Sequence, residues 1–159
     1  MEHEAKDTTK PLTHEGLYFE DYSIGMELET SGRTVTEADI VNFAGLTGDW
    51  NPLHTDEEFA KQSIFGRRIA HGTLIFSIMI GLLVRLGHVE KTIIAFYGID
   101  KLRFTNPVFI GDTIKAYSKV IELEDKGGYG IVTTETRAEK QSGEVVIKCI
   151  LKYAVKKKS

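Results

Sequence analysis

The sequence predicts an α+β fold in which a curved antiparallel β-sheet wraps around one long buried helix. Two observations carry this prediction. Ten of the fourteen residues at 73–86 are apolar and fall on every side of a helix, which indicates a helix enclosed by protein. After residue 90 the apolar period changes to two, which predicts five strands, at 92–100, 101–109, 113–124, 129–138 and 144–155.

The elements before the central helix follow from local signals. Residues 1–15 are polar and predict a disordered arm, whereas residues 16–159 predict a single domain that begins with a short strand near 27–34. Thr36 and Asp39 have the spacing of a capping box, so a helix starts at 37 and stops at Gly48. A second, shorter helix is expected to start at Thr55 and to run through Lys61.

Charge and cysteine content exclude several classes of function. The chain has 20 basic and 23 acidic residues, a net charge of −3, which gives no broad positive field for nucleic acid or an anionic membrane. Cys149 is the one cysteine, so no disulfide forms within the chain and no Cys-rich zinc site exists. With no apolar leader and no apolar run long enough to cross a bilayer, we expect a cytoplasmic protein without a membrane partner.

The outer face of the sheet also carries apolar residues. Val146 and Ile150 alternate with the inward residues of the last predicted strand. A second copy of the chain is the simplest cover for them, so we predict a homodimer.

A stiff loop lies between the two helices of the N-terminal half. Pro52 fixes its own φ and biases Asn51 toward an extended conformation, so Asp49 and His54 are held where both can contact one water. The alternative is a structural turn in which Asp49 bonds locally and His54 flanks the next helix. A metal site on Asp49, Asn51 and His54 is a third interpretation, but zinc sites usually use more His or Cys, and we predict no metal.

A second candidate site lies where the central helix begins. Gly72 allows a ligand to approach closely, and its N–H at a helix start suits a developing oxyanion; the alternative is a simple turn in which His71 packs or caps. Thr73 and Ser77 belong to a small or polar line along this helix, which indicates a pocket border or a close helix contact.

Basic residues flank both candidate sites. Arg67 and Arg68 precede the central helix, and Lys101 and Arg103 lie in a later predicted strand. They are candidates for binding phosphate groups, with a solvated charged face as the alternative.

Three segments together resemble the MaoC-like dehydratases, including the (R)-specific enoyl-CoA hydratases. They are Gly48–His54 (GDWNPLH), Ile69–Gly72 (IAHG) and Arg103–Asp112 (RFTNPVFIGD). The resemblance implies a hotdog fold, dimers, a catalytic Asp49 and His54, and Gly72 as the oxyanion donor. The chain departs from the family at two positions. Related hydratases often have proline where this chain has Arg68, and a serine at the position that we align with Ile80.

The resemblance implies reversible hydration of 2-enoyl-CoA to (R)-3-hydroxyacyl-CoA. We expect no cofactor, because coenzyme A enters as part of the substrate. A hotdog acyl-CoA thioesterase and a non-catalytic acyl-CoA-binding subunit are the alternatives. The residues expected to bind substrate are Asn51, His71, Thr73, Ser77, Arg67 and Arg68.

Overall fold

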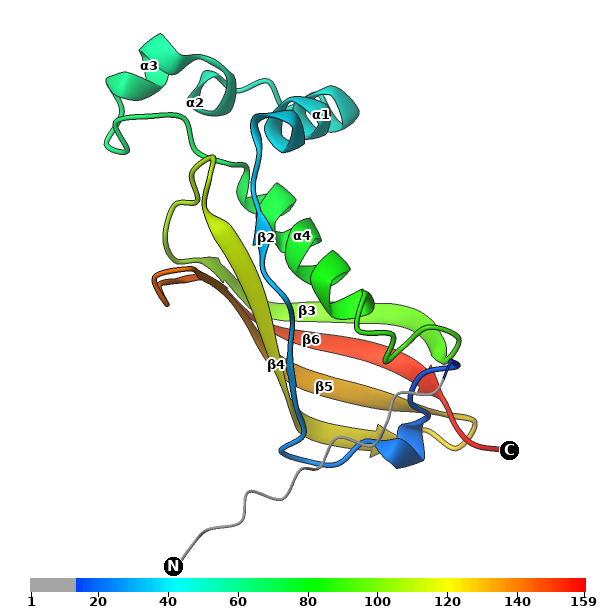
Figure 1. Cartoon of the computed structure of the whole chain (residues 1–159). Coiled ribbons are helices and arrows are strands. Elements are labelled where there is room, and N and C mark those ends of the chain that lie inside the picture. Colours follow the sequence, from blue (N-terminus) through cyan, green and yellow to red (C-terminus); the bar gives the residue numbers. More distant parts are fainter. Residues whose placement is uncertain (1–13) are drawn as a thin grey trace, which may run out of the picture.

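The computed structural model describes residues 14–159, and it confirms the predicted α+β class. A six-stranded antiparallel sheet has the order β1-β4-β5-β6-β3, with β2 pairing to β4 beside β1. Figure 1 shows this sheet curving around the helix α4 (Gly72–Val84). The arm predicted at 1–15 lies outside the described residues, except for residues 14 and 15.

Four long strands form most of the sheet, and two short strands complete one edge. Their bounds are β1 (Glu27–Glu29), β2 (Arg33–Thr34), β3 (Ile93–Phe104), β4 (Thr113–Asp125), β5 (Tyr129–Lys140) and β6 (Val145–Lys156).

The two strands predicted at 92–100 and 101–109 form the single strand β3, so that part of the prediction is wrong. The pairing of β3 with β6 shifts between Asp100 and Arg103, where a β-bulge at Lys101 absorbs an extra residue. Residues 105–109 leave the ladder because the chain bends at Asn106-Pro107, where proline has no N–H to donate.

The main core lies between α4 and the concave face of the sheet. Ile75 and Met79 of α4 pack with Ile114, Ile147 and the buried Cys149 of the strands. One line of α4 is exposed to solvent, at Thr73, Ser77, Gly81 and Val84. The expectation that protein encloses this helix on every side is therefore wrong for that line within the described chain.

Three further helices cluster beyond the N-terminal end of α4 (Figure 1). They are α1 (Glu37–Thr47), α2 (Pro52–Thr55) and α3 (Glu57–Lys61). The predicted capping box is confirmed, because Thr36 Oγ1 accepts from the Asp39 N–H and the Asp39 carboxylate accepts from the Thr36 N–H. The predicted helix 55–61 starts two residues later than expected, since Asp56 caps α3 and residues 52–55 form a separate turn.

The opposite end of α4 is closed by the 3-10 helix η1 (Phe19–Asp21) and the segment around it (Figure 1). Leu17 and Tyr22 pack there with Tyr153 and Val155 of β6. An ion pair of 2.6 Å between Lys158 Nζ and Asp21 Oδ1 joins this segment to the C-terminal residues. None of the helices in residues 14–159 has the length and apolarity that a membrane crossing requires.

Candidate active site

The loop between α1 and α3 holds Asp49 and His54 in fixed positions. Gly48 ends α1 with φ +78°, a left-handed conformation that glycine adopts without strain. Asn51 then caps α2, because its Oδ1 accepts from the Leu53 N–H at 2.9 Å, and Pro52 occupies the first helical position. The local sequence therefore turns the chain sharply after Asp49 and starts a new helical turn that carries His54.

The hydrogen bond of the His54 ring fixes which nitrogen is free. His54 Nδ1 lies 2.7 Å from the Ile69 carbonyl oxygen. A carbonyl only accepts, so Nδ1 carries the proton and Nε2 keeps a lone pair. Burial lowers the pKa of His54. The bond to Ile69 and the nearby Asp49 raise this pKa, but by less. The ring is therefore neutral near pH 7 and offers Nε2 as a base.

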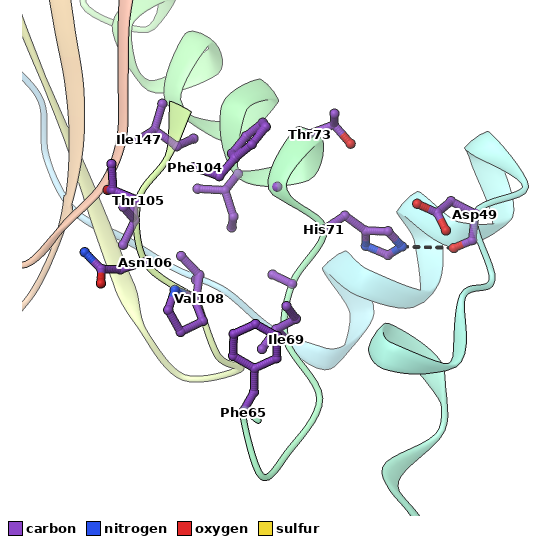
Figure 2. Close-up of a pocket in the computed structure, with 15 residues that line it drawn as sticks. Asp49, Phe65, Ile69, His71, Thr73, Phe104, Thr105, Asn106, Val108 and Ile147 are labelled. Atoms are coloured by element: carbon purple, nitrogen blue, oxygen red, sulfur yellow. Dashed lines mark hydrogen bonds between the residues drawn. The ribbon is translucent and has the colours of Figure 1, made fainter. Parts of the chain in front are cut away.

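His71 joins the two residues of the loop. Its side chain is buried, with 1% exposed, and its ring stacks on the His54 ring with centroids 3.9 Å apart. His71 Nε2 donates to the Asp49 carbonyl oxygen at 2.9 Å, the contact drawn as a dashed line in Figure 2. Its Nδ1 is buried and has no partner among the described residues. His71 therefore braces both Asp49 and His54, and it does so directly before α4.

The chemistry-bearing groups converge beside a cavity. One ligand atom each of Asp49, His54 and His71 lie within 4.8 Å of one another. Asp49 and His71 line a cavity of about 450 Å³ at the start of α4. Two imidazoles and a carboxylate are also a donor set that divalent metals accept, and the predicted absence of a metal stays a prediction.

Gly72 forms the wall of this cavity at the first position of α4. The first N–H groups of a helix have no partner within it, and the helix dipole makes them attractive to negative charge. A Cβ atom built on Gly72 would lie 2.8 Å from Phe104 Cδ1, so only glycine allows the Phe104 ring to lie this close. Figure 2 shows the Phe104 ring beside the first turn of α4.

The other residues predicted to bind substrate are placed differently. Thr73 lines the cavity, as His71 does. Asn51 uses its side-chain oxygen as the cap of α2. Ser77 is exposed and donates to the Thr73 carbonyl of its own helix, so the structure does not bring it to the cavity.

The two arginines before α4 also lie outside the cavity lining. Arg67 places its guanidinium 3.8 Å from the centroid of the Phe109 ring. Arg68 bonds to Glu37 at 2.7 Å and to Glu57 at 2.8 Å, so it ties α1 to α3. Arg68 thus holds the helices around the loop together.

Sequence reasoning missed much of the cavity wall. The side chains not predicted as site residues include Phe65, Phe104, Thr105, Asn106 and Ile147. The break at Asn106-Pro107 was the available signal, since it ends β3 beside the start of α4. Asn106 Nδ2 and Thr105 Oγ1 both donate to the Val145 carbonyl, at 2.7 and 2.6 Å, which fixes this rim.

Comparison with known sequences places the chain among related proteins. Residues 20–142 match the family model described as the MaoC like domain. The chain is 49% identical over 98 residues to Protein MaoC of Klebsiella aerogenes, covering 62% of this chain and 29% of that protein. It is 39% identical over 107 residues to the (R)-specific enoyl-CoA hydratase of Rhodospirillum rubrum, covering 67% of this chain and 71% of that protein.

Solved structures agree with the predicted hotdog fold. The MaoC-like dehydratase from Rhodospirillum rubrum superposes with a TM-score of 0.81 at 30% identity, over 91% of this chain and 99% of that chain. A Mycobacterium tuberculosis protein with a double hotdog fold superposes with a TM-score of 0.80 at 19% identity, over 90% of this chain and 45% of that chain. The second likeness concerns the fold alone.

Proposed function

Because the chain belongs to the MaoC-like dehydratase family, we propose that it catalyses the reversible addition of water to 2-enoyl-CoA thioesters, giving (R)-3-hydroxyacyl-CoA. The observation that carries the proposal is the convergence of Asp49 and His54 beside a cavity that opens at the start of α4. The chain spans 29% of the Klebsiella protein and 71% of the Rhodospirillum hydratase.

The pair Asp49 and His54 is proposed to act on one water. The free Nε2 of His54 takes a proton from this water while the Asp49 carboxylate accepts its second hydrogen bond. The hydroxide equivalent adds to C3 of the enoyl group, and the proton passes from the pair to C2. One water is thereby added across the double bond, and the reverse sequence removes it.

The remaining requirement is to stabilise the thioester oxygen as it gains negative charge. Gly72 lines the cavity as the first residue of α4, and we propose that its N–H, at the positive end of the helix dipole, binds this oxygen. The cavity walls of Ile75, Val108 and Ile147 offer an apolar surface to the acyl chain. Substrate binding and oxyanion stabilisation would thus come from α4, β6 and the segment after β3, and water activation from the loop after α1.

A thioesterase of the same fold is the second candidate function. Such enzymes place a carboxylate on the central helix, whereas residues 72–84 contain neither Asp nor Glu. A non-catalytic acyl-CoA-binding subunit would have no need of the braced Asp49–His71–His54 arrangement.

The test is absorbance at the enoyl-thioester band with crotonyl-CoA as substrate, together with a free-thiol assay. Loss of absorbance without thiol release is the expected result. Loss of absorbance with thiol release would identify a thioesterase, and no change with tight binding of crotonyl-CoA would identify a binding subunit.

The edge of the sheet formed by β3 supports the proposed homodimer. Within residues 14–159, β3 pairs only with β6, so its other edge is unpaired. Long, apolar, unpaired edges invite pairing with another chain. The exposed apolar side chains of this strand are Ile93, Ile94, Phe96, Tyr97, Ile99 and Phe104.

Sedimentation tests the dimer directly. Tyr97 is 63% exposed on β3, and Leu46 is 84% exposed on α1, away from this edge. We expect the wild type and Leu46→Lys to sediment as dimers and Tyr97→Lys to shift toward the monomer. A wild-type monomer at micromolar concentration would contradict the proposal.

A further inference from the structure

Three cationic side chains form a row across the outer face of the sheet. Arg103 of β3 is the register partner of Lys148 of β6, and Lys148 is in turn the partner of Arg137 of β5. Register partners on adjacent strands project to the same face, so the three charges lie side by side. Tyr117 of β4 continues the row, with the Arg137 guanidinium 4.4 Å from its ring centroid.

This row is only partly neutralised by the protein. Arg137 bonds to Glu139 at 2.7 Å. No carboxylate within residues 14–159 forms an ion pair with Arg103 or Lys148, and Arg103 Nη1 donates to the Leu102 carbonyl instead. Like charges directly opposite one another on a sheet are destabilising, so a bound anion would remove a standing repulsion.

Other lysines of the same sheet form ion pairs with carboxylates. Lys115 pairs with Glu29 at 3.2 Å, and Lys152 pairs with Asp100 at 3.3 Å. Arg103 and Lys148 differ from these two lysines, because neither has an ion-pair partner within residues 14–159.

A groove of about 970 Å³ lies over the row. Its lining holds five cations and three glutamates, namely Lys101, Arg103, Lys119, Arg137, Lys148, Glu27, Glu29 and Glu135. Two of the glutamates are paired, Glu27 with Lys119 and Glu29 with Lys115. Lys101 has φ +53° and is the one described residue other than glycine with a positive φ. That conformation costs free energy for a residue with a side chain. It is part of the bulge, which places Lys101 at the groove while Arg103 stays in register with Lys148.

The groove and the catalytic cavity flank the same two strand segments. Phe104 follows Arg103 in β3, and Ile147 precedes Lys148 in β6. Phe104 and Ile147 are register partners, and both line the catalytic cavity. Side chains alternate between the faces, so the cations and the cavity wall lie on opposite sides of one strand pair. Both hollows reach the end of the sheet where β3 stops and β6 starts. A ligand with a long flexible arm can pass over that end and occupy both.

We propose that Arg103, Lys148 and Arg137, with Lys101, bind the phosphate groups at the nucleotide end of the thioester substrate. This inference rests on the proposed function, since it assigns the carrier as coenzyme A. Guanidinium and ammonium groups bind phosphate through charge-assisted hydrogen bonds, and a row of them suits a ligand with several phosphates. Arg67 and Arg68, the other cations considered for this role, are engaged with Phe109 and with Glu37 and Glu57.

The test compares a full substrate with a truncated one. Crotonyl-CoA carries the nucleotide, and crotonyl-pantetheine lacks it. For Arg103→Gln and Lys148→Gln, the ratio of kcat/KM on crotonyl-CoA to kcat/KM on crotonyl-pantetheine should fall roughly three- to tenfold. Lys152→Gln removes the same charge from the same strand and face, outside the groove, and its ratio should match the wild type. Equal ratios in all three variants would overturn the proposal.

A binding measurement separates this proposal from the proposed function. Adenosine 3′,5′-bisphosphate should bind the wild type in calorimetry, with affinity lowered by Lys148→Gln. If it binds and the wild type hydrates no enoyl thioester, the nucleotide site stands and the proposed function fails. Inorganic phosphate binding equally well would reduce the groove to a general anion patch and overturn the proposal. A loss in Lys148→Gln confined to crotonyl-loaded acyl carrier protein would also overturn it, in favour of a docking surface for an acidic carrier.

Discussion

A buried histidine stands at each end of the central helix, and the two have different surroundings. His71 precedes α4 with 1% of its surface exposed, and His88 follows α4 with 5% exposed. In both rings Nδ1 has no partner within residues 14–159. At the first end the neighbours are Asp49, His54 and a cavity, whereas at the second end they are Tyr153 and the segment around Leu17.

The polar groups at the two ends of α4 have different partners. At the N-terminal end Gly72 and Thr73 of the first turn line the cavity, and His71 bonds to the loop that carries Asp49. At the C-terminal end the His88 carbonyl accepts from the Leu17 N–H at 2.7 Å, and an apolar cluster closes over the ring. We therefore expect substitutions at the first end to alter turnover and those at the second end to alter stability.

The largest expected effect is on turnover at the N-terminal end. Asp49→Asn keeps the side-chain shape but removes the charge that holds the water, and His54→Ala removes the base. Each should lower kcat by roughly 10²–10⁴-fold in steady-state hydration of crotonyl-CoA. The double variant should be about as slow as the slower single variant, because losing either contact already disrupts the shared water.

His88→Gln is the matched control for these variants, since it alters a buried polar ring at the far end of the same helix. Its kcat at pH 7.5 should stay close to the wild-type value. Near-normal hydration by a folded Asp49→Asn protein would remove Asp49 from the mechanism and return its loop to a structural turn.

The next effect is on stability in acid and belongs to the C-terminal end. Burial lowers the pKa of His88 from 6.5 to about 4, and an interaction with the Leu83 carbonyl only partly opposes this. Above pH 6.5 the ring is neutral in both folded and unfolded chains. As the pH falls from 6.5 to 4, the unfolded chain takes up a proton that the folded chain refuses, so stability drops by about 3 kcal/mol.

Urea unfolding at pH 7.5 and pH 4.5 measures this loss. The carboxylates titrate in the same window in every variant, so the informative quantity is the difference between the wild type and His88→Gln. The wild type should lose more free energy of unfolding on acidification. Equal losses would show that His88 is protonated in the folded protein.

Sequence patterns predicted the parts of the molecule whose causes are local. The Thr36–Asp39 capping box depends on neighbouring residues alone, and the same is true of the stiff turn around Pro52. The buried helix followed from its composition. The family resemblance then gave roles to Asp49 and His54, which spacing alone left open between a catalytic pair and a structural turn.

Contacts between distant residues were not predictable in the same way. Nothing local indicates that Arg68 meets Glu37, 31 residues earlier, or that His71 bonds to Asp49, 22 residues earlier. No glycine marks the bulge at Lys101, so the sequence pattern predicted two strands where the structure has one. These features depend on how the sheet and helices pack, and single-sequence periodicity carries no information on that.

A smaller effect is expected from Gly72→Ala, at the N-terminal end. The new methyl would meet three atoms of the Phe104 ring at 2.8–3.1 Å. Phe104 is 49% exposed, so the ring can move aside and stability should change little, but the cavity mouth changes shape. We expect kcat/KM for crotonyl-CoA to fall roughly ten- to hundredfold with an unchanged urea midpoint. Unchanged kinetics would show that Phe104 and Gly72 do not shape the binding site.

The smallest effect is expected between the two ends, from Gly81→Ala. Gly81 lies within α4 on its exposed line, and a Cβ there would meet no atom within 4 Å. Alanine lowers the entropy of the unfolded chain, so the free energy of unfolding should rise by about 0.5–1 kcal/mol. Because the residue touches neither end of the helix, kcat should not change. Urea unfolding and crotonyl-CoA kinetics check both statements. A loss of stability would mean that this line of α4 packs tightly against another copy of the chain, and the helix would then be enclosed on every side, as its composition predicts.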